Sequence, residues 1–340
     1  MHYLSATEKA VLYKKPAELT GIDGYINTGG SPIKISDYKG KSVVLVDIWT
    51  YSCINCQRTL PYITSWYGKY KDKGLVVIGV HTPEFAFEHV QKNVEDATKR
   101  FGITYPVVLD NNYETWNAFG NRFWPRKYLI DIDGYIVYDH IGEGDYDKTE
   151  LAIQKALMER SARMGGDTSA IATPTTKIQS TAGITGSPET YFGASRNKSL
   201  GNGEGGKVGE QNFIEPVTIK SNTLYLIGKW NITNEYAETS ASVGDGATSS
   251  DRIDYRYQSR NVYFVAGAKG SAVTMEVTQD GKPLDATNKG TDVFIKDGKS
   301  YVTISDNRLY KVVEGKKSEE HLLEFIISSP GLQAYTFTFG

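Results

Sequence analysis

Cysteine is almost missing from this chain, which has only two in 340 residues, at Cys53 and Cys56. A small secreted domain held together by disulfides needs several cysteine pairs at wider spacing, so that class is excluded. A structural zinc site needs four ligands, and no second Cys or His pair accompanies these two. Attached haem needs His directly after the second Cys, where the chain has Gln57. We therefore expect redox chemistry without a metal or a cofactor, with two inert buried thiols as the alternative.

The sequence also lacks an excess of one charge and a long apolar run. The 38 Lys and Arg nearly balance the 40 Asp and Glu, and no basic cluster indicates a nucleic-acid site. Residues 1–20 contain neither the apolar core of a signal peptide nor a membrane span. With 39% hydrophobic and 23% charged residues, the composition is typical of a soluble globular protein, and we expect protein partners.

The first half of the chain alternates strand-like and helix-like segments, which is typical of an open sheet covered by helices. Residues 42–49 are a nearly continuous apolar run, as a strand buried on both faces requires, and a helix follows from Cys53. The other expected elements are strands at 75–81 and 105–109, helices at 90–101, 113–119 and 148–160, and a hairpin of 127–131 with 135–140. Residues 1–160 are therefore predicted to form an α/β domain around a mixed sheet.

The second half has a different composition. Residues 161–190 are rich in Ser, Thr, Ala and Gly without an apolar period, which predicts a linker. Beyond it, polar and apolar residues alternate in short runs, and the pairs Asp280-Gly281 and Asp297-Gly298 are typical of tight turns between strands. Residues 191–340 are therefore predicted to form an antiparallel β-sandwich.

The spacing and position of the two cysteines favour a reversible disulfide. A thiolate attacks a disulfide, so a redox cysteine needs a group that stabilises negative charge. Cys53 lies where a buried strand ends and a helix begins, and the unpaired N–H groups of a helix N-terminus provide such stabilisation. Cys56 follows one helical turn later, on the same face and within disulfide reach.

Three further residues are candidates for the site. Asp47 interrupts the apolar strand six residues before Cys53, which suggests proton exchange with Cys56, although an ordinary hydrogen-bonded core carboxylate is the alternative. Glu84 follows the second parallel strand and can approach the dithiol, or it can be an exposed loop acid. Trp49 is a candidate for substrate contact, but packing beneath the site is the simpler interpretation.

Other functional readings have ordinary structural alternatives. His81 and His89 lack partners at metal-ligand spacing, so we expect them to be structural or exposed to solvent. Four aromatic residues of the second half could stack on a sugar, although most aromatics in a β-sandwich belong to its core: Trp230, Tyr236, Tyr255 and Tyr257.

The motifs around the cysteines resemble a known family. Residues 44–49, the cysteine pair and Pro61 are similar to the active-site strand and helix of the thioredoxin superfamily. Essentially the whole chain resembles the soluble C-terminal region of DipZ-type thiol-disulfide oxidoreductases, in which this region follows a CcdA-like membrane domain. The segments that carry this closer resemblance are 49–61, 79–85, 124–125, 188–191 and 330–340.

The resemblance implies a thioredoxin-like fold followed by a jelly roll similar to carbohydrate-binding modules. It also implies roles for single residues. Cys53 is the attacking thiol, Cys56 the resolving thiol, Asp47 the buried acid beneath them, and Pro125 a cis-proline facing the dithiol. The backbone of Trp124 is then free to pair with an extended substrate peptide.

The implied function is an extracytoplasmic disulfide reductase, tethered to a membrane in the full-length protein. Its electrons come from the CcdA-like membrane domain, its substrates are disulfide-bearing proteins, and a carbohydrate is a possible ligand of the second half. Related reductases that mature cytochrome c often carry an acidic residue three positions after the second cysteine, where this chain has Thr59. Two alternatives remain open, a cytosolic general thioredoxin and a ligand-binding module with an auxiliary redox domain.

Overall fold

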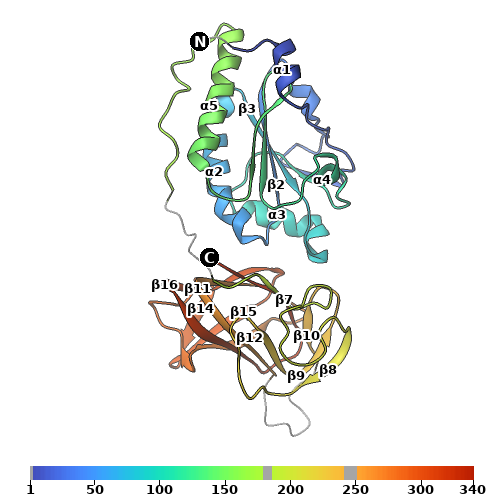
Figure 1. Cartoon of the computed structure of the whole chain (residues 1–340), viewed down its shortest axis with the longest axis vertical. Helices are drawn as coiled ribbons and strands as arrows, with labels where there is room; N and C mark the ends of the chain where they lie inside the picture. Colours follow the sequence, from blue (N-terminus) through green and yellow to red (C-terminus); the bar gives the residue numbers. More distant parts are fainter. Residues whose placement is uncertain (1–2, 179–185, 241–250) are drawn as a thin grey trace. The chain divides into compact units, whose positions relative to one another are not determined.

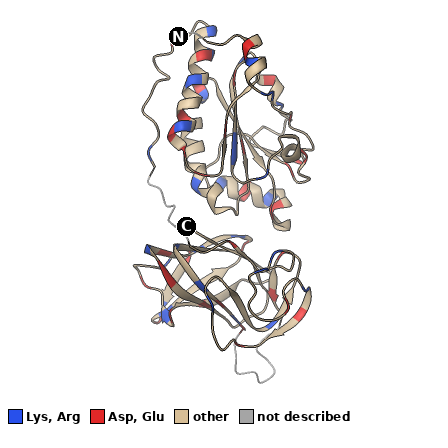
Figure 2. Cartoon of the chain, viewed as in Figure 1, with Lys and Arg blue, Asp and Glu red and all other residues tan. Residues whose placement is uncertain are grey.

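The structure is a computed structural model that describes residues 3–178, 186–240 and 251–340 (Figure 1). The chain divides into two compact units, residues 1–180 and 181–340. No helix within the described ranges is both long and apolar enough to cross a membrane. Figure 2 shows basic and acidic residues interspersed along helix α5 (Tyr146–Arg163), in keeping with the balanced charge of the sequence.

The first unit is built on a six-stranded mixed sheet with the strand order β1-β4-β3-β2-β5-β6. Strands β2, β3 and β4 run parallel, and the other neighbours are antiparallel. Helices α2 and α5 pack against one face of the sheet, and Trp116 of α4 packs against the other. The strands are β1 (Gly24–Ile26), β2 (Val43–Trp49), β3 (Leu75–His81), β4 (Val107–Leu109), β5 (Arg126–Ile130) and β6 (Ile136–Ile141). The helices are α1 (Ala6–Leu12), α2 (Ile54–Tyr70), α3 (Gln91–Arg100), α4 (Glu114–Ala118) and α5.

These elements confirm the predicted α/β fold. Strand β3 has the predicted bounds, and β2 begins one residue later than expected. Strand β4 is shorter than the predicted 105–109 and begins after Pro106, which has no N–H to donate to a neighbouring strand. The short elements α1 and β1 were not predicted, because three to seven residues are too few to show a period.

The start of the predicted linker packs on the first unit. Helix α5 continues to Arg163, and the segment 164–178 has no regular structure, yet Ile171 is only 2% exposed. The backbone of Thr176 donates a hydrogen bond of 2.6 Å to Glu150, and the hydroxyl of Tyr62 donates one of 3.0 Å to the carbonyl of Ile178. Composition predicted a linker because Ser and Thr are common in loops, but here their backbone groups bind the helices.

We expect a chain ending at residue 180 to be more stable than one ending at residue 160. The shorter chain loses Arg163, the buried Ile171 and several part-buried hydrogen bonds, each worth about 1 kcal/mol, so the difference should be about 2–4 kcal/mol. Urea unfolding of both chains measures it. Both should retain the dithiol chemistry, because every candidate site residue lies before residue 160. Equal unfolding midpoints would show that the segment 164–178 contributes nothing.

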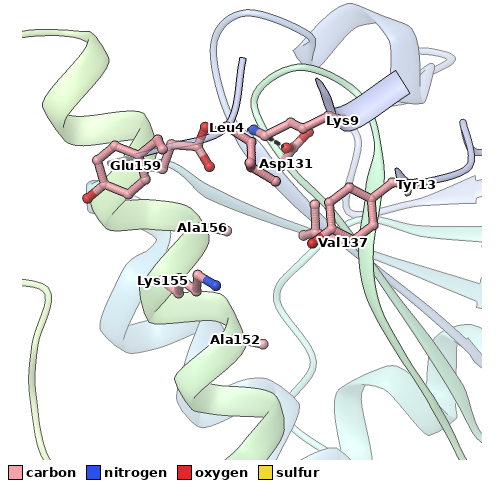
Figure 3. A pocket seen from close by; sticks show the side chains of 10 residues that line it. Leu4, Lys9, Tyr13, Asp131, Val137, Ala152, Lys155, Ala156 and Glu159 are labelled. Carbon is pink, nitrogen blue, oxygen red and sulfur yellow. Dashed lines mark hydrogen bonds and ion pairs between the residues drawn. The ribbon is translucent and has the colours of Figure 1, made fainter. Parts of the chain in front are cut away.

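One buried lysine of helix α1, Lys9, binds this helix to the rest of the first unit (Figure 3). The ammonium of Lys9, which is 2% exposed, donates hydrogen bonds to Asp131 at 2.5 Å, Asp133 at 2.8 Å and Glu159 at 2.6 Å. Burial alone would lower the pKa of Lys9, but these three carboxylates raise it overall. Oxygens of the three carboxylates lie within 4.8 Å of one another, a spacing that could also hold a metal ion. In this structure the Lys9 ammonium occupies that position. A cavity of about 130 Å³ adjoins this cluster.

Replacing Lys9 with Met should destabilise the first unit by about 3–5 kcal/mol at neutral pH, because it leaves the buried Asp131 without its cation, whereas Asp133 and Glu159 remain paired with Arg163. Thermal or urea unfolding measures this effect. Lys155→Met is the matched control, since Lys155 lines the same cavity but is exposed (Figure 3). An equal loss in both variants would contradict the role of the buried cluster.

Within residues 186–240 and 251–340, the regular elements of the second unit are all strands, and all pairings between its named strands are antiparallel. Its two longest strands, β11 and β16, pair with each other, and β11 pairs with β9 near its start and with β17 near its end. The strands are β7 (Thr190–Tyr191), β8 (Gly209–Phe213), β9 (Leu224–Ile232), β10 (Ala237–Thr239), β11 (Asp251–Ala268), β12 (Val273–Gln279), β13 (Lys282–Pro283), β14 (Val293–Lys296), β15 (Lys299–Ile304), β16 (Arg308–Ile327) and β17 (Leu332–Phe339). This confirms an all-β antiparallel second unit.

Both predicted tight turns are present. Asp280 and Gly281 join β12 to β13, and Asp297 and Gly298 join β14 to β15. All four residues have positive φ, between 51° and 75°, which is the backbone conformation of the two-residue hairpin turn. Of the aromatics considered for sugar stacking, three have rings in the hydrophobic core, namely Trp230, Tyr255 and Tyr257.

Candidate active site

The two cysteines lie at the start of α2, directly after the buried strand β2. Cys53 is the N-cap residue of α2, and its sulfur accepts a hydrogen bond of 3.5 Å from the backbone N–H of Cys56. Cys53 is half-buried, whereas Cys56 is 1% exposed. Both are free thiols, so the structure represents the dithiol state. A partner disulfide can therefore approach Cys53 more readily than Cys56.

Burial raises the pKa of Cys56 well above its usual value, and the neighbouring Cys53 sulfur raises it further. The charge of Asp47 acts in the same direction. Cys56 therefore holds its proton at neutral pH. Before Cys56 can attack, this proton has to move to another group.

Asp47 is a group that can take a proton near neutral pH. It is 1% exposed, and neither carboxylate oxygen has a hydrogen-bond partner among the described residues. Burial raises its pKa to about 6, although the charge of Lys127 opposes the shift. The alternative reading of a hydrogen-bonded core carboxylate is therefore wrong. The carboxyl is buried without such bonds.

Lys127 completes a buried pair that the sequence reasoning missed. It lies directly opposite Asp47 in the β2–β5 register and is 0% exposed. Its ammonium donates a hydrogen bond of 2.9 Å to the carbonyl of Gly142. Burial lowers the pKa of Lys127, while the charges of Asp47 and then Cys56 raise it. In the sequence, Lys127 is recognisable only as a lysine beside a short apolar run. No local pattern predicts that Asp47 lies opposite it on the neighbouring strand.

A second set of contacts holds α2 against the loop after β6. The guanidinium of Arg58 donates hydrogen bonds of 2.8 and 2.7 Å to the carboxylate of Glu143 and one of 2.6 Å to the side chain of Asn55. Gly142, next to Glu143, donates its backbone N–H to the carbonyl of Pro125 at 2.8 Å. Asn55, which lies between the cysteines, is thus connected to Pro125 through the Arg58–Glu143 ion pair and a backbone hydrogen bond.

The Trp124–Pro125 peptide bond is cis, which confirms that part of the prediction. Pro125 is buried. The indole N–H of Trp124 donates a hydrogen bond of 3.0 Å to the carbonyl of Thr82, and its ring packs on Trp116 with the ring centroids 4.3 Å apart. The side chain of Trp124 is therefore fixed by the fold. Contact of its backbone with substrate stays a prediction.

Glu88, which the sequence reasoning also missed, fixes the turn before Cys53. It lies in the short 3-10 helix Ala86–His89 and is 0% exposed. Its carboxylate accepts hydrogen bonds from the N–H and hydroxyl of Ser52 at 3.1 and 2.8 Å, and from the N–H groups of Glu84 and Phe85 at 2.6 and 3.1 Å. The predicted acid Glu84 is half-buried, and its backbone serves this contact. Ser52 and Glu88 are 36 residues apart, so no local sequence pattern indicates this contact.

Trp49 is 0% exposed, so it packs beneath the site and does not present its ring to a substrate. Its ring meets His81 edge-on, with the centroids 5.2 Å apart. His81 is also 0% exposed, and burial lowers its pKa to about 3, so it is neutral. His89 is exposed. The structural and solvent-facing interpretations of the two histidines therefore fit the structure.

Both units match known family models. Residues 18–157 match the model described as Redoxin, and residues 187–340 match the one described as Thioredoxin like C-terminal domain. Among solved structures, the solution structure of a thioredoxin-like protein in its oxidized form is 24% identical and covers 44% of this chain and 97% of its own, with a TM-score of 0.40. The two family models, together with the fold and the paired cysteines, define a thioredoxin-like protein.

Two relatives narrow this class. The chain is 38% identical to Protein DipZ of Mycobacterium tuberculosis over 325 residues, which is 95% of this chain and 42% of the relative. It is 31% identical to the thiol-disulfide oxidoreductase ResA of Bacillus thuringiensis over 126 residues, 37% of this chain and 69% of the relative. The chain belongs to the thioredoxin-like thiol-disulfide oxidoreductases. It spans about two fifths of the length of its DipZ relatives.

Proposed function

We propose that this chain is the reductase part of a longer extracytoplasmic protein and that it reduces disulfides in partner proteins. The observation that carries the proposal is the unequal burial of the two thiols, with the half-buried Cys53 at the helix N-cap and Cys56 buried behind it. In such an arrangement the sulfur of Cys53 can react with the substrate first, and the sulfur of Cys56 reacts in the second step.

In the first step the Cys53 thiolate attacks one sulfur of the partner's disulfide. A bond between Cys53 and that sulfur forms, the partner's disulfide breaks, and its other sulfur leaves and takes up a proton. In the second step Cys56 loses its proton and attacks the sulfur of Cys53, which releases the partner's second thiol. The partner gains two electrons and two protons, and the Cys53-Cys56 disulfide forms.

The buried carboxyl of Asp47 is the proposed acceptor of the Cys56 proton. Because the pKa of Asp47 is about 6, its carboxyl is mostly ionised at neutral pH and can therefore accept a proton. This pKa is also close enough to neutral pH for the carboxyl to release that proton again. Lys127, opposite it in the sheet, stabilises the ionised form and so keeps Asp47 able to accept. Lys127 acts through Asp47 and is therefore a positioning residue.

Electrons would return to the Cys53-Cys56 disulfide from a CcdA-like membrane domain of the same protein. This proposal is supported by 38% identity to DipZ over 95% of the chain and by the greater length of that relative. The extracytoplasmic location depends on the same similarity. A role in cytochrome c maturation is less favoured, because Thr59 is the residue three positions after Cys56.

The direction and the electron donor can be tested together. In the source organism, the thiols should be found largely reduced, and removal of the membrane donor should make the disulfide accumulate, as measured by alkylation and mass shift. NADPH with a thioredoxin reductase should not reduce the purified disulfide efficiently. Rapid reduction by that system would favour a cytosolic general thioredoxin instead.

We also propose that the second unit is a ligand-binding module with a jelly roll of the carbohydrate-binding type. Its antiparallel strands and its match to a separate family model support an independent role. Because the rings of Trp230 and Tyr255 lie in the core, a sugar would have to bind through other groups.

A further inference from the structure

The second unit contains a polar cavity of about 340 Å³ between β11, β16 and the loop after β13. This volume lies at the lower end of the range for small-molecule sites, about 300–1,000 Å³. Its twelve lining residues include Tyr257, Arg260, Asn288, Lys316 and Lys317. The cavity lies in one unit, and none of its lining residues belongs to the redox site.

An irregular pairing of β11 with β16 creates the cavity. Ser259 pairs with Glu319 and Asn261 pairs with Glu314, so one residue of β11 faces four residues of β16. Gly315 allows the bulge to close, because a Cβ at this position would lie 2.8 Å from the carbonyl oxygen of Arg260. Bulges often redirect side chains at functional sites, and this one brings Lys316 and Lys317 to the cavity.

The opposite wall is held rigidly by the loop after β13. The side chain of Asn288 donates a hydrogen bond of 2.9 Å to Gln279 and accepts one of 2.8 Å from the N–H of Asp285. Its carbonyl accepts a hydrogen bond of 2.9 Å from the N–H of Glu314 on β16. The side-chain amide of Asn288 is therefore fixed at the cavity before any ligand arrives.

The hydroxyl of Tyr257 is a hydrogen-bonding group that the cavity offers to a ligand. Tyr257 lines the cavity and is 1% exposed, and its ring stacks on Phe339 with the ring centroids 6.2 Å apart. Within residues 3–178, 186–240 and 251–340, its hydroxyl has no hydrogen-bond partner. The hydroxyl oxygen is not fully shielded from solvent, so it can form a hydrogen bond with a molecule in the cavity.

The charges around the cavity select the ligand. Arg260, Lys316 and Lys317 outnumber the one lining carboxylate, Glu319, and His321 is paired with Asp280 at 2.7 Å. Cations at one side favour an anionic group, while the tyrosine hydroxyl and the amides of Asn288 and Gln279 favour hydroxyls. We propose that this cavity binds a small hydroxylated anion, a sugar acid or a sugar phosphate.

The proposal can be tested with the full chain by calorimetric titration of D-glucuronic acid, glucose 6-phosphate, glucose and inorganic phosphate. At least one of the two anionic sugars should bind at least tenfold more tightly than both glucose and inorganic phosphate, and the better of the two identifies the anionic group. Tyr257→Phe keeps the ring and should weaken that ligand about tenfold, the effect of one lost hydrogen bond. Lys316→Gln with Lys317→Gln should remove the preference over glucose.

Lys296→Gln is the control, because Lys296 is an exposed lysine of the same unit outside the cavity. It should leave binding unchanged. The proposal would be overturned if neither anionic sugar bound, or if inorganic phosphate bound as tightly as the better of the two. So would unchanged affinity in the Tyr257 and double lysine variants. Disulfide reduction measured in the same samples separates this outcome from a failure of the proposed redox function.

Discussion

Cys53→Ser should abolish disulfide reduction, whereas Cys56→Ser should still attack substrates and accumulate as a mixed disulfide. The reason is the difference in burial, since Cys53 is half-buried at the N-cap of α2 and Cys56 is 1% exposed. Loss of a nucleophile that acts in a multistep reaction typically lowers turnover by at least about a thousandfold. The Cys56 variant should also turn over poorly, but it retains the first step.

Two measurements separate the roles of the thiols. Brief alkylation of the reduced protein at neutral pH, followed by peptide mapping, should label Cys53 first, because burial raises the pKa of Cys56. Electrophoresis without reductant should reveal mixed disulfides with Cys56→Ser only. Preferential labelling of Cys56, or trapped complexes with Cys53→Ser, would reverse the assignment. In cells, the trapped partners of Cys56→Ala would identify the substrates.

Local sequence patterns were enough to predict the elements that carry the thiols. A continuous apolar run gave β2, and the cysteine at its end gave the start of α2, because both features depend on neighbours in the sequence. The Asp-Gly pairs likewise gave two hairpin turns of the second unit, since positive φ at both positions is a local requirement. The cis bond at Pro125 came from family resemblance and not from local physics.

The groups around the thiols could not be predicted in the same way. Lys127 meets Asp47 only because β5 pairs with β2 in one register, across about eighty residues of chain. Glu88 fixes Ser52 through side-chain contacts between two loops. Such contacts depend on tertiary packing, and the hydrophobic periodicity and residue spacing of a single sequence do not indicate which distant residues will meet.

Asp47→Asn should slow the second step of reduction about tenfold to a hundredfold near neutral pH, because a positioned general base contributes rates of this order or more. It should also remove the inflection near pH 6 from the pH dependence of that step, since the pKa of Asp47 is about 6. Stopped-flow measurement of release of the partner from a preformed mixed disulfide follows this step alone. Asp110→Asn is a matched control, because Asp110 is buried but hydrogen-bonded by Thr115 and Trp116.

The same substitution should stabilise the fold above pH 6. The pKa of Asp47 is about 6 in the folded chain against an ordinary 3.8, so the folded state binds this proton more tightly than the unfolded state. The destabilisation by the carboxylate is therefore absent below about pH 3.8 and fully present above about pH 6. At about 1.4 kcal/mol for each tenfold difference in proton affinity, it amounts to about 3 kcal/mol.

Lys127→Met distinguishes a proton acceptor from a merely structural charge. Because Lys127 lowers the pKa of Asp47, its removal should move the inflection in the pH dependence of the second step to higher pH. Combined with Asp47→Asn, it should add little further loss of rate, since Lys127 acts through the carboxylate. Additive losses in the double variant, or a pH profile that neither variant changes, would show that the pair only supports the sheet. Because Lys127 lies opposite Asp47 across β2 and β5, its removal should change the pH dependence of the second step. Burial of Asp47 alone would not predict this change.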